Sequence, residues 1–560
     1  MERSYWTKTL AERTLSRRKA LAMGAAGLSS AAFLAACGGS DDDGGDSSTP
    51  GASAESGTPQ RGGKFATISN GVTNENPVSN YSGGYSLAGD KVYDRLLTST
   101  TTTEGYRLEA AEKVEIPDPQ QIVFTLKAGM VYQNVAPVSG RAVKASDVVA
   151  TQQYVLQLPN AYDKSFQRDV VQSVTAPDEK TVVFKLKQPD AYAFGGSKLG
   201  LQTSQAIIPP ELYDNLDAGK PVGSGPYQLS DSTPNVKYVF RRFDGYRGAS
   251  KNMPYVDEKE MQILTDVVAI ETALRAGQLQ YWNTAPLPRI DSIVSESGGK
   301  IKQISVKGLG FWGLHMNMER NFPWQKDDRV RQAMYRVVNR QQILDLVFAS
   351  KGVLPPALLQ AGLANYQLSA KDTEQYYKQD LAEGKRLLAA AGWDANREVQ
   401  LTTRPDGLNS QAAEVIAQQF ATLGIKNRVV PVAGGAWLSE TMARGEYEMN
   451  ISSSPGGDTP YMTIRYLHSD QKTQFNHFGL KDPAIDALIE KSEVTVDRDD
   501  NIKLVKQIQL EGLKKYGSVL NLVTQDVVSL LDAKVQGFVL PPSTNNVDAG
   551  YQDGMWIKQS

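Results

Sequence analysis

The second half of the chain alternates β-type segments with amphipathic helices, and this alternation limits the fold more than any other feature. The segment REVQLTTRP predicts a strand, SQAAEVIAQQFATLG a helix and IKNRVVPV a second strand, an order typical of a βαβ unit. The segment from Asp327 to Phe348 places its apolar residues on one helical face, which predicts a further helix. We therefore expect this half to form an α/β unit of its own.

Single residues predict two helix boundaries in this half. The helix in GKRLLAAAGW should stop at Gly392, because glycine readily adopts the left-handed backbone of a C-terminal cap. The helix in KDPAIDALIEKS should begin with Asp482 as N-cap and Pro483 in its first turn.

The first half contains two similar segments, PDPQQIVFTLK from Pro117 and PDEKTVVFKLK from Pro177. Each predicts a turn that leads into an alternating strand. We expect two similar strands of one sheet rather than a duplicated functional unit. Between them, KASDVVATQQYVL predicts a helix capped by Ser146 or Asp147.

The N-terminus has the features of an export signal. Basic residues precede a run of small and apolar residues that is too short to span a membrane comfortably. The pair Arg17 and Arg18 resembles a twin-arginine signal, although Ala20 stands where that signal usually has Phe. We expect residues 1–36 to be a signal peptide, with the twin-arginine and general export routes both open.

The only cysteine of the chain, Cys37, follows this apolar run directly. Leu34 to Cys37 resembles a bacterial lipobox, in which the cysteine is acylated and becomes the first residue of the mature protein. A lone thiol has no disulfide partner, and acyl chains would hold a protein at a membrane surface. We expect Cys37 to be lipidated and the protein to be anchored to the cell membrane on its extracytoplasmic side.

Residues 37–60 are rich in Gly, Ser, Asp and Pro and lack apolar periodicity, which predicts a flexible tether. The remaining chain of roughly 500 residues is long enough for about three domains. With 60 Lys and Arg against 62 Asp and Glu, the chain has no strong net charge, which argues against a nucleic-acid partner.

Six segments, taken in order, resemble the extracytoplasmic solute-binding proteins of family 5, which serve peptide, opine and nickel ABC importers and include the oligopeptide-binding proteins. The segments are PVGSGPYQL, ALRAGQLQYW, HMNMERNFPWQKDDRVRQAMYRVVNRQQIL, LLAAAGW, AWLSETMARGEYE and NHFGLKDPAIDALI. Each segment alone is a weak signal, and six in the same order are specific.

The resemblance implies an α/β, two-lobed periplasmic-binding-protein-like fold of type II, with a hinge of crossing strands and a subdomain inserted in the first lobe. Lobe I would comprise residues 61–306 and 525–560, the inserted subdomain about 91–190, and lobe II residues 307–524. The motif GSGPY around Ser224 resembles a tight turn of the family, for which we expect a structural role.

The resemblance also implies a function in which no bond is made or broken. A peptide or similar small polar solute that contacts both lobes would favour the closed state, and an ABC permease in the membrane would recognise that state. We expect a monomer without enzymatic activity, metal or other cofactor.

Three ligand-binding residues follow from the resemblance. Trp437 matches a family position whose aromatic ring stacks on the ligand. Trp312 matches a position on the first strand of lobe II whose aromatic side chain faces the ligand. Asn476 matches a polar position opposite the ligand backbone. For Trp437 a place in the hydrophobic core is an equally good interpretation.

The sequence departs from the family at ISSSPGGDTPYM. Peptide binders carry there an acid that holds the peptide ammonium, whereas here Asp458 comes slightly late. Either Asp458 reaches the amine or the ligand has no ammonium, because a buried unpaired ammonium is costly. Ser452, Ser453 and Ser454 offer hydroxyls to peptide, sugar or another polar solute, although serine is also ordinary at strand ends.

The first lobe contributes two further candidates, Asn70 and Tyr85, from the loop after the strand KFATIS. Loops at strand ends carry ligands in open α/β sheets, and these two residues are otherwise simply parts of turns.

The sequence leaves three other functions open. A lipid-anchored hydrolase lacks a recognisable nucleophile or metal motif, although a carboxylate pair would leave no motif. A second alternative is a binding protein for a sugar, an opine or a metal complex such as nickel or haem. His315 and His477 are the available ligands for a metal. A lipoprotein that senses or scaffolds without import is the third.

Overall fold

The computed structural model describes residues 57–69, 92–99, 106–158, 164, 166–195, 198–199, 205–216, 220–308, 310–405, 407–454, 457, 459–470, 477, 479–540 and 554–559. The predicted signal peptide and most of the tether, including Cys37, lie outside the described residues. So do four of the predicted ligand-binding residues, which are Asn70, Tyr85, Asp458 and Asn476.

A six-stranded mixed sheet forms the centre of the second half. Its order is β14 (Gly352–Val353), β18 (Val519–Gln525), β13 (Phe311–Met316), β17 (Met449–Ser454), β15 (Glu398–Thr403) and β16 (Lys426–Pro431). Strand β15 runs parallel to β16 and to β17, while β13 is antiparallel to both of its neighbours. The parallel pair β15 and β16 with the helix between them confirms the predicted βαβ unit.

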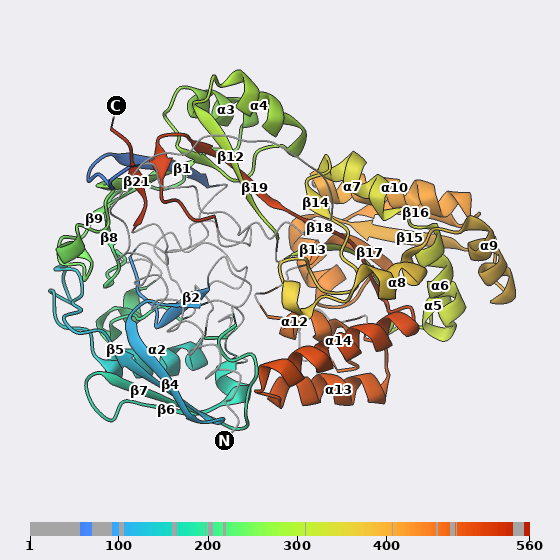
Figure 1. Ribbon diagram of the computed structural model, residues 1–560, viewed down its shortest axis with the longest axis horizontal. Coiled ribbons are helices and arrows are strands. Elements are labelled where there is room, and N and C mark those ends of the chain that lie inside the picture. The colour runs from blue at the N-terminus through green and yellow to red at the C-terminus, as the bar shows by residue number, and fades with distance from the viewer. Residues whose placement is uncertain are drawn as a thin grey trace, which may run out of the picture.

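The helices of the second half lie around this sheet (Figure 1). They are α5 (Pro323–Lys326), α6 (Asp328–Val337), α7 (Arg340–Phe348), α8 (Ala370–Tyr377), α9 (Leu381–Ala390), α10 (Gly407–Thr422), α11 (Gly434–Ala436), α12 (Tyr461–Ile464), α13 (Pro483–Val494) and α14 (Arg498–Lys514). Helix α13 lies on the outer side of α14. Both predicted boundaries are confirmed: Gly392 follows α9 with a φ of 67°, and the Asp482 carboxylate accepts the amides of Ala484 and Ile485.

The single helix predicted from Asp327 to Phe348 is wrong, because two helices, α6 and α7, occupy this segment. Asn339 lies between them with non-helical backbone, and its side chain accepts a hydrogen bond from the amide of Gln342. An asparagine in this position caps a new helix. The apolar face continues across the break, which is why the periodicity does not reveal it.

The first half of the chain, together with the C-terminal strands that return to it, is built on three sheets. One has the order β1 (Lys64–Ser69), β10 (Glu258–Ile263), β9 (Lys237–Arg242) and β8 (Tyr227–Thr233), and a second has the order β11 (Tyr281–Trp282), β19 (Val527–Asp532) and β12 (Ile301–Val306). Helix α3 (Val267–Arg275) packs beside β11, and helix α4 (Ile290–Glu296) packs beside β12. Two short pairs, β2 (Leu97–Ser99) with β3 (Tyr106–Leu108) and β20 (Val535–Gln536) with β21 (Trp556–Ile557), complete the described strands.

The third sheet has the order β4 (Ala111–Asp118), β5 (Gln121–Leu126), β7 (Thr181–Leu186) and β6 (Val171–Thr175). Strands β5 and β7 are the two similar segments of the sequence and pair with each other, which confirms the prediction of one sheet. Helix α2 (Ala145–Gln157) packs on it, but the predicted cap is wrong. Lys144 is the cap residue, and Asp147 accepts the Lys144 amide at 2.9 Å from inside the first turn.

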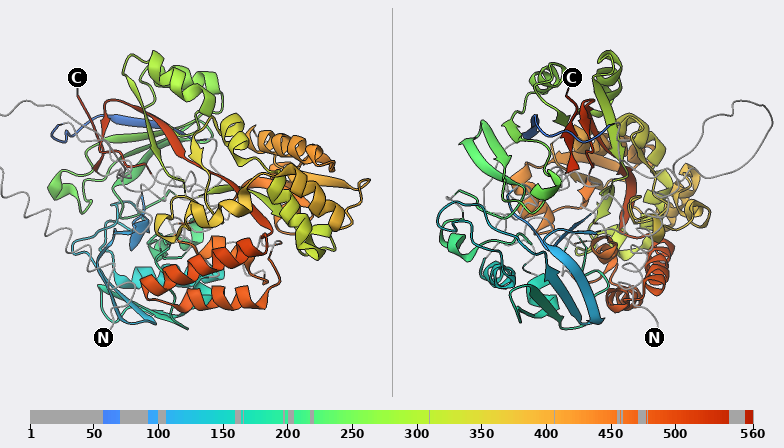
Figure 2. Two further views of the ribbon diagram at one scale, coloured as in Figure 1. Left: turned by 45° about the vertical axis from the view of Figure 1, so that its right-hand side comes forward. Right: turned by 60° about the vertical axis from the view of Figure 1, so that its left-hand side comes forward.

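The chain passes between the two halves twice, from β12 to β13 and back from β18 to β19. Leu520 of β18 and Leu530 of β19 belong to one buried apolar cluster. Figures 1 and 2 show the six-stranded sheet on one side, and α13 and α14 beside the sheet that contains β5 and β7. Within the described part of the chain, no helix is both long and apolar enough to cross a membrane.

Candidate functional site

One edge of the six-stranded sheet collects the predicted lobe II residues that the structure describes. The C-terminal end of β17 meets the N-terminal end of β13 there, with Phe311 opposite Ser454 and Trp312 opposite Ser453. The chain leaves the sheet toward β12 and β19 at this same edge. Strand ends at such an edge carry ligands in open α/β sheets, so the structure brings Trp312 and the three serines together in a suitable place.

The three serines have different surroundings, because alternate residues of a strand point to opposite faces. Ser452 and Ser454 are buried, whereas Ser453 between them is exposed. Ser453 is therefore the serine of the three whose hydroxyl is open to a direct contact with a solute.

Ser454 contacts a histidine that leans along the neighbouring strand. The Ser454 hydroxyl lies 2.8 Å from His315 Nε2, and His315 reaches it across Gly313. A Cβ atom at Gly313 would lie only 2.9 Å from the same nitrogen, so the contact requires glycine. Burial lowers the pKa of His315 to about 4, which keeps the imidazole neutral at neutral pH.

Trp437 begins a π-helical turn (Trp437–Met442) after α11 and joins the buried face of β17. Its indole Nε1 donates to Asn450 Oδ1 at 3.2 Å, and Asn450 Nδ2 donates to Ser452 Oγ at 2.9 Å. The Arg404 guanidinium lies 5.5 Å from the centre of the Trp437 ring, at a distance suited to a cation–π interaction. We call Arg404, Trp437, Asn450 and Ser452 the Trp437 cluster.

Trp312 is packed into the protein at the point where the chain crosses between the halves. Its side chain is 7% exposed, its ring lies 5.1 Å from that of Phe348, and its Nε1 donates to Gln525 Oε1 at 3.1 Å. Gln525 is the last residue of β18. Trp312 thus ties β13 to β18, and its predicted contact with a ligand stays a prediction.

Four residues of this region were not predicted from the sequence. Arg404 and Asn450 belong to the Trp437 cluster, and Gln360 and Thr463 form a hydrogen-bonded pair that contacts Gly457 after β17. Gln360 Nε2 donates to the Gly457 carbonyl at 2.9 Å, and Thr463 Oγ1 donates to Gln360 Oε1 at 3.1 Å. Most of these partners are far apart in the sequence, and the only available signal was that Arg404 stands near the end of the predicted strand REVQLTTRP.

The histidines do not form a common site in the described structure. His315 contacts Ser454, whereas His477 Nε2 donates to the Met442 carbonyl at 2.9 Å. Among the described residues, no group of three or more His, Cys, Asp or Glu side chains could hold a metal ion.

The GSGPY motif has the structural role that was expected. Ser224 is buried and donates to Asp94 Oδ2 at 2.9 Å, and Arg247 pairs with the same carboxylate. A Cβ atom at Gly223 would lie 2.1 Å from the Val92 carbonyl oxygen. The motif therefore packs against the segment around Asp94, where no side chain larger than hydrogen fits at Gly223.

Comparison with known protein families gives a match over residues 105–474 to the model described as "Bacterial extracellular solute-binding proteins, family 5 Middle". The chain is 24% identical over 490 residues to the dipeptide-binding protein of Escherichia coli, an alignment that covers 82% of this chain and 88% of that protein.

Solved structures of similar fold include two with bound ligands. The oligopeptide-binding protein AppA of Bacillus subtilis, in complex with a nonapeptide, has a TM-score of 0.71 and 19% identity, covering 90% of this chain and 100% of that one. AgaA from A. tumefacien R10, in complex with agropinic acid, has a TM-score of 0.73 and 21% identity, covering 89% and 99%.

Proposed function

Because the chain belongs to the bacterial extracellular solute-binding proteins of family 5, we propose that it captures a peptide or similar small polar solute and delivers it to an ABC permease. The similar structures confirm the predicted α/β periplasmic-binding-protein fold. The family match over most of the chain is the observation that carries the proposal.

The proposed mechanism is the closure of two lobes around the solute. Lobe I is assigned residues 61–306 and 525–560, with the inserted subdomain at about 91–190, and lobe II residues 307–524. The double passage of the chain between sheets supports this division. Lys307 and Asp526, one from each crossing segment, are ion-paired at 3.1 Å, so the two segments would bend together as one hinge.

The Trp437 cluster supports a ligand with peptide-like chemistry. Asn450 and Ser452 occupy the buried side of β17, and Arg404 places a cation beside the indole of Trp437 at the strand ends. A guanidinium pairs well with a carboxylate because its donors match the two oxygens. We assign Arg404 to the carboxylate of the solute, and Ser453 to its polar backbone.

The proposal also includes the surface anchor and the absence of catalysis. Acylation of Cys37 would tether the two lobes to the outer side of the cell membrane through residues 37–60, after export and removal of residues 1–36. Mass spectrometry of the N-terminal residue of the mature protein tests the acylation. The protein would act as a monomer and release its solute unchanged.

Thermal unfolding with trialanine tests the proposed function. A ligand at 100 times its Kd stabilises the folded state by about 2.7 kcal/mol, so trialanine at 100 times its Kd should raise Tm by a few degrees. Recovery of the peptide unchanged separates binding from hydrolysis. No rise in Tm with trialanine or with peptides of other lengths would contradict peptide binding, and mass spectrometry of solutes released on denaturation would then identify a sugar, opine or metal complex.

Arg404→Gln is expected to weaken the binding of trialanine about 10-fold, since a hydrogen bond to a charged group contributes about 1.5–3 kcal/mol. Titration calorimetry with trialanine and with trialanine amide measures this effect, which the amide should not show. Arg428→Gln is the control, because Arg428 pairs with Glu398 on the exposed side of β16. Equal losses for both peptides would contradict the assignment of Arg404.

A further inference from the structure

The turn after β7 contacts α13 and α14, although 300 residues separate Tyr192 from Ser492. The Ala191 amide donates to the Glu493 carbonyl at 2.7 Å. The Tyr192 hydroxyl lies 3.3 Å from Ser492 Oγ, and it accepts a hydrogen bond from Asn501 Nδ2 at 3.1 Å. All three residues are at least 99% buried, so this is a buried polar contact between the first and second halves of the chain.

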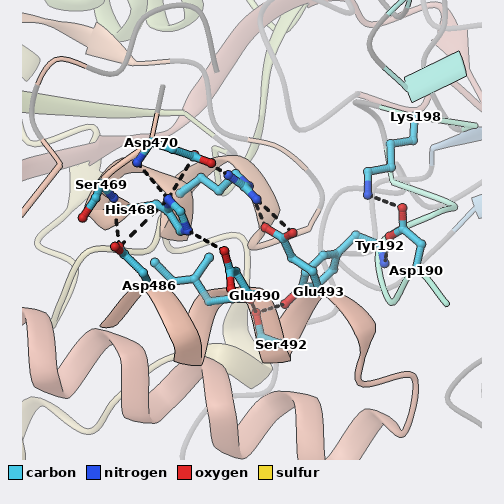
Figure 3. A network of polar contacts seen from close by, with 12 residues as sticks. Asp190, Tyr192, Lys198, His468, Ser469, Asp470, Asp486, Glu490, Ser492 and Glu493 are labelled. Atoms are coloured by element: carbon cyan, nitrogen blue, oxygen red, sulfur yellow. Dashed lines mark hydrogen bonds and ion pairs between the residues drawn. The ribbon is translucent and has the colours of Figure 1, made fainter. Parts of the chain in front are cut away.

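The surface that receives Tyr192 is held in place by a buried arginine. Arg465 donates to both carboxylate oxygens of Glu493, at 2.6 and 3.0 Å, and to Asp470 at 3.0 Å. Its side chain is 3% exposed. Figure 3 shows Tyr192 directed at Ser492 on the helix, next to Glu493. These bonds of Arg465 therefore hold the C-terminal end of α13 in one position.

A second contact lies a few residues further along the same segment. The Lys198 ammonium pairs with Asp190 (Figure 3) and lies 4.2 Å from the centre of the Tyr461 ring. A Cβ atom at Gly195 would lie 2.7 Å from the methyl carbon of Thr459. Residues 190–195 and Lys198 thus pack against both the helices and the segment Thr459 to Tyr461.

Thr459 and Tyr461 belong to the segment that follows Ser452–Ser454 in the sequence. The Gln360 and Thr463 hydrogen bonds hold this segment from the side of the second half. Contacts between the halves and the candidate ligand contacts are therefore only a few residues apart on one short piece of backbone. Any displacement of one half from the other must separate Tyr192 from Ser492 and Asn501, and Lys198 from the Tyr461 ring.

We propose that Tyr192 and Lys198 are positioning residues, which stabilise the closed state and set the position of the segment after β17 for the solute. This inference rests on the proposed function, in which the lobes close around a solute. Neither residue needs to touch the solute. A closed state that these contacts favour binds the solute more tightly, because less of the binding free energy is spent on closing the lobes.

Tyr192→Phe tests the proposal because it removes only the hydroxyl. In the full-length protein without ligand, hydrogen–deuterium exchange in the peptide spanning 190–195 should become about 5-fold faster, as expected for the loss of one net hydrogen bond. The Kd of trialanine should rise by about the same factor.

Tyr335→Phe is the matched control. The Tyr335 hydroxyl is also buried, and it donates to the carbonyls of Gly517 and Val519 within the second half. This variant should lower Tm without changing the exchange of 190–195 or the Kd of trialanine. Equal effects of the two variants on Kd would overturn the proposal.

The exchange experiment also separates this inference from the proposed function. If 190–195 exchanges at the wild-type rate in Tyr192→Phe, the positioning role is overturned whether or not trialanine binds. If no peptide binds the wild-type protein while the 5-fold faster exchange is seen, the contact stands and the assignment of a peptide ligand fails.

Discussion

Gly308→Ala is expected to destabilise the protein by about 3 kcal/mol, at the upper end of the usual cost of overpacking. An added Cβ atom would lie 2.2 Å from the carbonyl oxygen of Gln525, which is a backbone atom and cannot rotate away. Gly308 and Gln525 belong to the two segments that cross between the halves, so the strain falls on the proposed hinge. Urea unfolding followed by tryptophan fluorescence measures the loss.

Gly310→Ala is the control in the same crossing segment. Its added Cβ would lie 3.4 Å from the Ser454 carbonyl oxygen, which is ordinary van der Waals contact. We expect a change in the free energy of unfolding below about 1 kcal/mol, as is usual away from special backbone features. If Gly308→Ala is as stable as Gly310→Ala, the close approach of the two crossing segments is not present in solution.

Acidification from pH 6.5 to pH 4 is expected to remove about 3 kcal/mol of stability through His315 alone. Burial lowers its folded-state pKa to about 4 from the ordinary value of 6.5, and each pKa unit corresponds to about 1.4 kcal/mol. Between these values the unfolded chain binds the proton and the folded protein does not, so stability falls as the pH falls. Above about pH 7.5, where the histidine is neutral in both states, this contribution no longer changes.

The measurement compares the wild-type protein with His315→Gln across this range. The glutamine amide can replace the bond of Nε2 to Ser454, but it does not titrate. Because the carboxylates contribute equally to both proteins, the difference in their free energies of unfolding isolates His315. A difference that is the same at pH 4 and pH 7 would show that the imidazole is not buried in its neutral form.

Local features of the fold were predictable because neighbouring residues decide them. The paired strands β5 and β7 followed from a repeated alternation, the end of α9 from Gly392 and the start of α13 from Asp482. Two predictions of helix ends were wrong. The break at Asn339 and the role of Lys144 as cap depend on which of several nearby side chains reaches a helix end, and the apolar periodicity is the same for each choice.

The site was less predictable. The sequence singled out Trp437 and the three serines, but not which serine is exposed, and it placed Trp312 near a ligand without revealing its bond to Gln525. Arg404 carried no motif. The alternation of side chains along a strand places Ser453 on the opposite face from Ser452 and Ser454. It does not show which face is buried, because that depends on the helices that cover the sheet.

By itself the sequence determined the α/β class, the family and the chemistry of the strand ends, since composition, periodicity and ordered motifs are properties of the chain read along its length. Only the tertiary structure decided that His315 reaches Ser454 across Gly313, and that Tyr192 meets Ser492 and Asn501. The reason is physical. Such contacts join residues from distant segments, so they depend on strand register and on the docking of whole elements, which many sequence positions set together.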